Sequence, residues 1–257
     1  MRVRRPQSRR SIPIAVLLLC LSVCASTPAA YAQISNLYPD FFRLENPEVL
    51  DLILYGGGFG SPKYGTAQQG LQLAQSITPY FGVVGRITGY QLWIGDDFLN
   101  PLAPGSGHSA RLNFARLQAG GEFAIYPGTR LFLLGGGDVG DSHAAVIEGD
   151  MSSWLLTHSR HPLNFSFSAN HDYQNHVTSS EIDLRMVAYS TENYLLTAGG
   201  GGAIYQGGLI TSAVGQGGPD LGIYLRRWGF GVDVQAGYGN ANGYGQLSLI
   251  KQFDFTE

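Results

Sequence analysis

The sequence predicts an all-β chain that forms a single antiparallel transmembrane β-barrel of about twelve strands. Three observations lead to this prediction. Apolar and polar residues alternate along many short stretches. Short turns and longer loops also alternate along the chain, and the chain begins with an export signal. A period of two residues is the signature of a strand whose two faces meet different surroundings.

The first 32 residues are typical of a secretory signal peptide. The basic stretch MRVRRPQSRR precedes the apolar run IPIAVLLLCLSVCA, and AYA before Gln33 is a small-residue cleavage site. We therefore divide the chain into a signal peptide at 1–32, a short periplasmic lead at 33–47 and a barrel at 48–257.

Both cysteines, Cys20 and Cys24, lie within the signal peptide. The mature chain then has no thiol for a disulfide, a metal site or a redox site. In an alternative interpretation the protein is a lipoprotein acylated at Cys24, although Val23 is bulkier than the residue usual before such a site.

The charge balance argues against nucleic acid as a partner. Residues 1–32 hold five of the 16 basic residues and none of the 19 acidic ones, so the mature chain has a net charge of about −8. Nucleic-acid binding needs a basic surface. No apolar run after residue 32 is long enough for a membrane helix, and nothing in the sequence calls for a cofactor.

Five short turns are predicted at TPYF, YPGT, HSRHP, STEN and RRWG. Six longer, glycine-rich connections lie between them: GSPKYGTAQQG, GDDFLNPLAPGSGH, VGDSHAA, DYQNHVTSS, YQGGLITSAVGQGGP and GNANG. The alternation of five short turns with six longer connections requires about twelve strands. It also places both chain ends on the side of the short turns. The short turns are expected to face the periplasm, and the longer loops are expected to face the outside of the cell.

The stretch 230–238 shows the alternation, with apolar residues such as Val234 at even positions and polar ones such as Gln235 at odd positions. After GNANG the pattern restarts, with Leu247 apolar and Ser248 polar. Asn and Gly between two such runs predict a hairpin. The same alternation occurs in 115–125, 163–173, 182–188 and 221–225.

A soluble secreted sandwich would also alternate, with its apolar face turned into a core. The signal peptide, the unequal connections and the aromatic residues near strand ends favour a membrane barrel, whose apolar face meets lipid between two aromatic girdles. A closed sheet also satisfies every backbone group in lipid. The aromatic residues near predicted strand ends are Tyr80, Phe81, Trp93, Tyr126, Trp154, Tyr194, Trp228 and Phe255.

The alternating spans and the closing strand YGQLSLIKQF resemble the outer-membrane β-barrel proteins of Gram-negative bacteria, over roughly residues 48–255. The resemblance implies an outer-membrane location, contact with membrane lipid and lipopolysaccharide, and recognition of the last strand by the outer-membrane assembly machinery. Phe255 is followed by Thr256 and Glu257, whereas such strands usually end on the aromatic residue.

The polar phase of the strands predicts a charged lumen with five arginines and nine acids. In a narrow barrel these groups are expected to pair. Two interpretations stay open, a cross-braced interior that stiffens the barrel and a constricted pathway for a small solute. The predicted lumen residues are Asp51, Arg86, Arg116, Glu122, Arg130, Asp138, Glu148, Asp150, Glu181, Asp183, Arg185, Asp220, Arg226 and Asp233.

The alternative from another class is a membrane-embedded hydrolase of the Ser/His esterase or lipase type. Such a site needs serine and histidine within hydrogen-bond reach. Ser142 and His143 are adjacent, so on a strand they point to opposite faces. His171 is on the lipid phase, whereas Ser168 and Asp172 are on the other.

The remaining motifs point to structure. His158 and His161 fall in a predicted turn, and the stretch NHDYQNH is expected to be a solvated loop rather than a metal site at His171, Asp172 and His176. The glycine runs lack the strand–GxGxxG–helix setting and the Walker lysine of nucleotide loops. Glycine in these strands is expected to permit bends.

Overall fold

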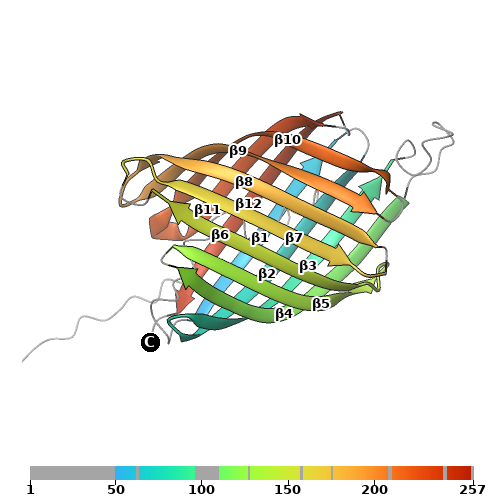
Figure 1. The fold of residues 1–257 in the computed structure, drawn as a ribbon, viewed down its shortest axis with the longest axis horizontal. Coiled ribbons are helices and arrows are strands. Elements are labelled where there is room, and N and C mark those ends of the chain that lie inside the picture. Colours follow the sequence, from blue (N-terminus) through green and yellow to red (C-terminus); the bar gives the residue numbers. More distant parts are fainter. Residues whose placement is uncertain are drawn as a thin grey trace, which may run out of the picture.

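The computed structural model describes residues 50–61, 64–95, 110–126, 128–156, 159–174, 176–207, 210–239 and 242–255. The predicted signal peptide and periplasmic lead lie outside the described residues. The described chain forms one closed antiparallel barrel of twelve strands, which confirms the predicted fold class (Figure 1).

The strands follow one another around the barrel in chain order. They are β1 (Leu50–Gly60), β2 (Tyr64–Thr78), β3 (Phe81–Ile94), β4 (Ala110–Tyr126), β5 (Thr129–Gly140), β6 (Ala145–Leu155), β7 (Leu163–Asp172), β8 (Val177–Ser190), β9 (Tyr194–Gly207), β10 (Ile210–Leu225), β11 (Phe230–Gly239) and β12 (Asn242–Phe255). A single turn of 3-10 helix, η3 (Arg226–Trp228), joins β10 to β11. No helix in the described ranges has the length and hydropathy needed to cross a membrane.

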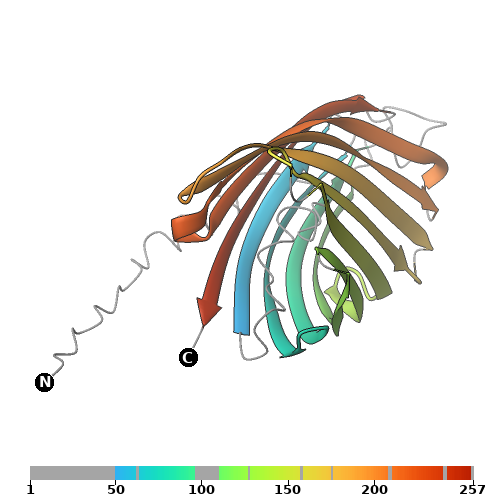
Figure 2. The same cartoon turned by 60° about the vertical axis from the view of Figure 1, so that its left-hand side comes forward.

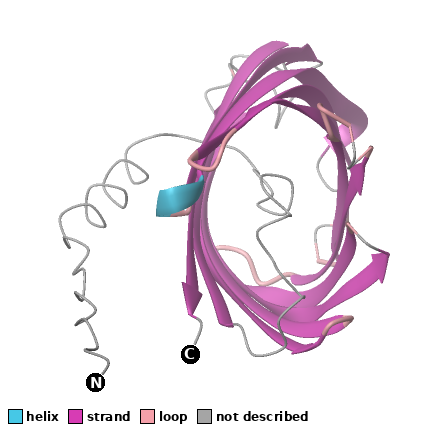
Figure 3. Ribbon diagram, turned by 90° about the vertical axis from the view of Figure 1, so that its left-hand side faces the viewer, coloured by secondary structure: helices cyan, strands magenta, loops and turns pink. Residues whose placement is uncertain are grey.

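The last strand closes the barrel against the first. Leu50 pairs with Phe255 and Gly60 with Gly245, in an antiparallel ladder (Figure 2). Viewed nearly along its axis, the ring is closed and elongated in cross-section (Figure 3). Closure gives every strand a partner on both sides, so the backbone polar groups bond within the sheet.

Three strands extend further toward the loop end than the sequence predicted. β2 already begins at Tyr64, and β9 and β10 reach Gly207 and Ile210, so two predicted outer loops are largely strand. Conversely, the predicted short turn HSRHP belongs to a connection that spans 156–162. The backbone groups of these polar and glycine residues stay paired because the neighbouring strands provide hydrogen-bond partners. Composition alone does not reveal this pairing.

We call the end of the barrel with Leu50, Phe255 and the short turns the turn end, and the other end the loop end. The predicted turn between β2 and β3 is two residues long, Pro79 and Tyr80, and the one between β8 and β9 covers 191–193. Most of the predicted loop GDDFLNPLAPGSGH, at the loop end, lies outside the described residues.

The outer face of the barrel is apolar in the predicted phase. Val234 is 50% exposed, whereas the adjacent Asp233 is 1% exposed. Other exposed apolar residues on several strands include Leu73, Ile87, Leu117, Leu133, Ile147, Ile182, Leu184 and Leu221. An apolar outer face with a polar inner face is the pattern of strands that meet lipid on the outside.

The inner face is not polar throughout, which the sequence analysis did not predict. An apolar cluster fills the interior near the turn end. Its buried members are Ile53, Tyr55, Ala74, Val84, Phe132, Leu134, Val187, Leu195, Tyr224 and Ile250, with Trp154 packed against them. We call this set the apolar floor. Trp154, predicted to be a girdle residue on the lipid face, instead lies inside because it shares the inward phase of Asp150 and Ser152.

The two faces of β11 predict opposite responses to a charge. Val234→Arg should lower the free energy of unfolding by about 2–4 kcal/mol, because the charge would face the hydrocarbon core. Gln235→Arg points inward toward carboxylates and should fold better. The fraction of heat-resistant folded band on unheated gels measures both variants, and equal behaviour would contradict this assignment of faces.

Two adjacent glycines of β5 should differ in the same assay. A Cβ on Gly136 would lie 1.9 Å from the carbonyl oxygen of Leu117, whereas a Cβ on Gly135 would meet nothing within 4 Å. Gly136→Ala should therefore destabilise the barrel by about 1–3 kcal/mol. Gly135→Ala is the matched control and should leave the melting midpoint unchanged. Equal midpoints for the two variants would contradict the close approach of β4 and β5.

Candidate functional site

The charged side chains inside the ring form the candidate site. Most of the predicted lumen residues are buried: Asp51, Arg86, Arg116, Glu122, Asp138, Glu148, Asp150, Asp183, Arg185, Asp220 and Asp233. Arg130 and Glu181 are partly buried. The period-two pattern therefore places these side chains on the inside of the ring, where they meet one another.

Arg86 on β3 is the centre of the first ion cluster. Its Nη1 forms an ion pair with Glu148, and its Nη2 lies 3.5 Å from Oδ2 of Asp150. Its Nε donates to the side-chain carbonyl of Gln72 at 2.8 Å, and Gln118 donates to Glu148 at 2.8 Å. Since β3 and β6 are not neighbours in the ring, the Arg86 pairs reach across the interior.

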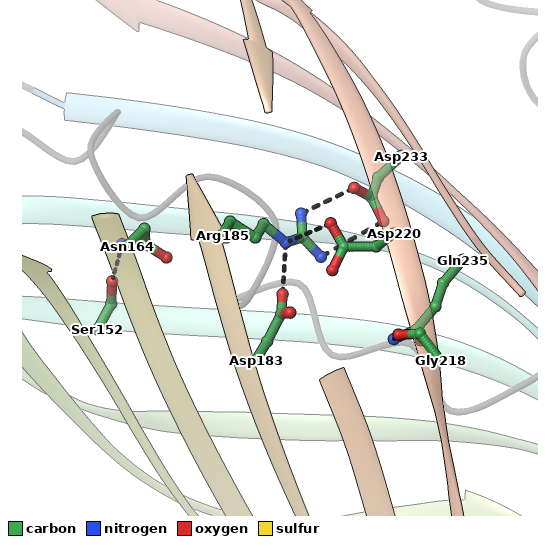
Figure 4. A network of polar contacts seen from close by, with 8 residues as sticks. All are labelled: Ser152, Asn164, Asp183, Arg185, Gly218, Asp220, Asp233 and Gln235. Atoms are coloured by element: carbon green, nitrogen blue, oxygen red, sulfur yellow. Dashed lines mark hydrogen bonds and ion pairs between the residues drawn. The ribbon is translucent and has the colours of Figure 1, made fainter. Parts of the chain in front are cut away.

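Arg185 on β8 is the centre of the second ion cluster (Figure 4). Its Nε pairs with Asp183 and lies 3.3 Å from Oδ1 of Asp220, and its Nη1 lies 2.8 Å from Oδ2 of Asp233. One guanidinium thus serves three aspartates that come from β8, β10 and β11. All four side chains are at most 8% exposed.

Arg116 on β4 forms an ion pair apart from these two clusters. Its Nε and Nη2 donate to the two carboxylate oxygens of Asp138, at 2.7 and 3.0 Å. Its guanidinium lies 5.3 Å from the ring centroid of Tyr90 and 5.8 Å from that of Phe114. The Ser142 hydroxyl donates to the same aspartate at 2.8 Å. A bidentate pair that lies against two stacked rings fixes the guanidinium in one position.

The fourth pair joins the neighbouring strands β4 and β5 close to the turn end. Arg130 Nη1 lies 3.2 Å from Glu122 Oε1. The arginine is 15% exposed and the glutamate 3% exposed.

The structure corrects the prediction for Arg226, which is exposed and lies in η3 outside the wall of the lumen. Its Nη2 donates to the Ser190 hydroxyl at 3.0 Å, between two turn-end connections. The sequence analysis extended the phase of β10 by one step beyond Leu225, where the strand ends and the backbone turns.

The apolar floor could have been found from a specific signal. In RLFLL of β5, Leu131 and Leu133 occupy one phase while Phe132 and Leu134 occupy the other. A stretch that is apolar on both phases indicates burial on both faces. Phe132 is 2% exposed and Leu134 1%, whereas Leu133 is 49% exposed.

Between the Arg185 cluster and the loop end lies a cavity of about 30 Å³, enough for about two waters. Its lining includes one guanidinium, two carboxylates and three glutamine side chains. The residues concerned are Glu181, Asp183, Arg185, Gln216, Gln235, Tyr244 and Gln246, together with the small residues Gly201, Gly202 and Ala203.

The barrel wall is irregular beside this cavity. The ladder between β10 and β11 has a gap at Gly218 and Pro219, between the pairs that Gly217 and Asp220 make. Proline has no N–H to donate. The side-chain amide of Gln235 donates to the Gly218 carbonyl oxygen at 3.4 Å (Figure 4). The Gln235 side chain thus bonds to a backbone carbonyl oxygen at the gap in the ladder.

The residues of the hydrolase alternative have other partners. The His171 ring bonds to the Thr178 hydroxyl at 2.9 Å, and the His161 ring bonds to the Val187 carbonyl oxygen at 2.9 Å. His143 is exposed, and the neighbouring Ser142 bonds to a carboxylate. The described geometry provides no serine activated by a histidine.

His158 lies outside the described residues. Among the described residues, no group of three or more His, Cys, Asp or Glu side chains is placed to hold a metal ion.

Removing the guanidinium of Arg185 should destabilise the barrel strongly. Arg185→Ala leaves the buried carboxylates of Asp183, Asp220 and Asp233 without their shared cation, which should cost about 3–5 kcal/mol. Arg226→Ala is the matched control, because that arginine is exposed. The midpoint of heat unfolding on unheated gels measures both, and an unchanged midpoint in Arg185→Ala would show that these carboxylates are solvated.

No known protein family and no curated protein matches this sequence. Solved structures match its fold. An outer-membrane channel from Pseudomonas putida F1 matches with a TM-score of 0.53 at 8% identity, over 81% of this chain and 96% of that chain. The β domain of the Bordetella autotransporter BrkA matches with a TM-score of 0.54 at 10% identity, over 82% of this chain and all of that chain. The chain therefore has the fold of the outer-membrane β-barrels.

Proposed function

We propose that this protein is an outer-membrane β-barrel with a closed, charge-braced interior, a structural or surface membrane protein rather than an open pore. The observation that carries the proposal is the apolar floor. Its residues come from β1, β2, β3, β5, β8, β9, β10 and β12, and they pack together in one cluster. Since these strands lie all around the ring, the cluster spans the interior from wall to wall.

The exposure of the ion pairs supports the same proposal. Arg86 and Glu148 are 5% and 4% exposed, and Arg185 and Asp233 are 8% and 1% exposed. Charges that line a water-filled pathway keep contact with water, whereas these are covered by protein. Buried pairs of this kind add little net stability over apolar residues, but they penalise any arrangement that separates them. They therefore favour one fixed packing of the interior.

The outer face supports location in a membrane. Leu117, Ile182 and Val234 are 46–52% exposed on strands whose opposite side is buried. The partners that follow are outer-membrane lipid and lipopolysaccharide on this face, and the outer-membrane assembly machinery during insertion. The outer membrane also explains the predicted signal peptide, because the chain has to be exported first.

Planar-bilayer recording of the refolded protein tests closure. The wild-type barrel should give no steady current, because the apolar floor leaves no continuous water path. Phe132→Ser, which opens the floor and adds a polar group, should produce a leak. Leu133→Ser on the outer face is the matched control and should stay closed if it inserts. A steady ohmic current from the wild type would support the narrow-channel interpretation instead.

A further inference from the structure

Lys251 of β12 is a charged residue on the face of the strand that otherwise meets lipid. Its neighbours Ile250 and Gln252 are 2% and 6% exposed and point inward, so Lys251 points outward, in the phase of the exposed Leu247. A charge on this face is costly at mid-membrane but costs little near a membrane surface. Lys251 pairs with Phe230, the first residue of β11, at the turn end. Its charge is therefore placed near the membrane surface at that end.

The 3-10 turn η3 lies on the outer side of the ring (Figure 3) and is held against β12. The Lys251 ammonium group donates to the carbonyl oxygen of Trp228 in this turn, and to that of Gln252 at 3.3 Å. It also lies 4.5 Å from the ring centroid of Phe253. The Gln252 N–H donates to the Gly229 carbonyl oxygen at 2.7 Å. These contacts join the lysine and the turn into one unit.

Two exposed arginines of η3 add to the charge of Lys251. No described carboxylate forms an ion pair with Arg226 or Arg227. The adjacent connection 191–193 contains one acidic residue, the exposed Glu192. This connection lies beside η3, because the Arg226 N–H donates to the Asn193 carbonyl oxygen at 2.8 Å. Three cations and one carboxylate leave a surplus of about two positive charges.

Aromatic side chains place these charges at a membrane surface. Trp228 is 65% exposed and Tyr189 is 52% exposed. Tyr189 stacks on Tyr194 with ring centroids 5.7 Å apart, and Tyr194 pairs with Leu225, the residue before η3. Exposed tryptophan and tyrosine at the end of a barrel wall lie among lipid headgroups. The positive surplus is therefore at the level of the lipid phosphates.

We propose that η3 and Lys251 form a binding site for the phosphate group of an anionic phospholipid in the leaflet at the turn end. Arg226 and Arg227 supply guanidinium donors, which match the oxygens of a phosphate in pairs. Lys251 supplies a point charge on the side of the lipid chains. A zwitterionic headgroup brings its own cation, so the surplus favours a headgroup with a net negative charge. The inference rests on the proposed membrane location.

Quenching of Trp228 fluorescence by brominated lipid chains tests the site. The refolded protein is inserted into vesicles of phosphatidylcholine and phosphatidylglycerol, with bromine on the chains of one lipid at a time. Trp93→Phe is present in every protein compared, because Trp93 lies near the loop end, whereas Trp154 is packed inside the ring. Phosphatidylglycerol should quench Trp228 more than its share of the lipid predicts, and added NaCl should lower this preference.

The double variant Arg226→Gln with Arg227→Gln should lower the binding constant of phosphatidylglycerol relative to phosphatidylcholine about fivefold or more. Arg111→Gln with Arg160→Gln is the matched control, because it removes two exposed arginines elsewhere and should keep the wild-type preference. Lys251→Met is a further variant that should fold, because an apolar side chain suits the outer face. It should also lower the preference.

Equal quenching of the wild type by the two lipids overturns the proposal, as does a preference that survives both Lys251→Met and the double variant in η3. The charges would then suit an acidic soluble partner instead. A preference abolished by inorganic phosphate, but not by NaCl at equal ionic strength, would show a site for free phosphate and also overturns it. Quenching by neither lipid removes the membrane location together with the site, whereas equal quenching removes the site alone.

Discussion

The ladder between β1 and β12 joins Leu50 to Phe255 and turns twelve strands into a ring with no free edge. In hydrocarbon, an unpaired backbone group costs several kcal/mol, so this closure is the condition for the fold to exist in a membrane. Closure also creates an interior that side chains have to fill. The distribution of apolar and charged residues inside the ring is a consequence of that requirement.

Two kinds of side chain share the interior. At the turn end, Ile53 of β1, Phe132 of β5 and Leu195 of β9 come from strands on different sides of the ring and pack together. Next to them, long charged side chains such as Arg86 and Arg185 reach across to carboxylates on strands that are not their neighbours. The inward residues of β7, which include Ser166 and Ser168, are short and leave room for this reach.

The apolar floor and the cavity lie at different levels of the barrel. The apolar floor lies near the turn end, whereas the cavity lies on the side of the Arg185 cluster that faces the loop end. The missing ladder pairs at Gly218 and Pro219 lie in the wall beside the cavity.

The sequence by itself determined the all-β class, the strand number, the place of most short turns and the face of the strands that is apolar and points outward. It did so because successive side chains of a strand point to opposite sides, so a period of two is a local property that no distant contact changes. Val234 outside and Asp233 inside follow from this alone. The same period of two predicted which charged residues point inward. Arg226 is the exception, because β10 ends just before it.

Tertiary structure decided what the inward residues meet. Whether Arg185 pairs with Asp233 or Arg86 with Glu148 depends on the register of several ladders added around the ring, and no single strand contains that information. Trp154 shows the same limit, because an aromatic residue near a strand end suits a girdle and an interior cluster equally well. The cavity has the same origin, since it is the space left where glycines of β9 face acidic side chains of β8.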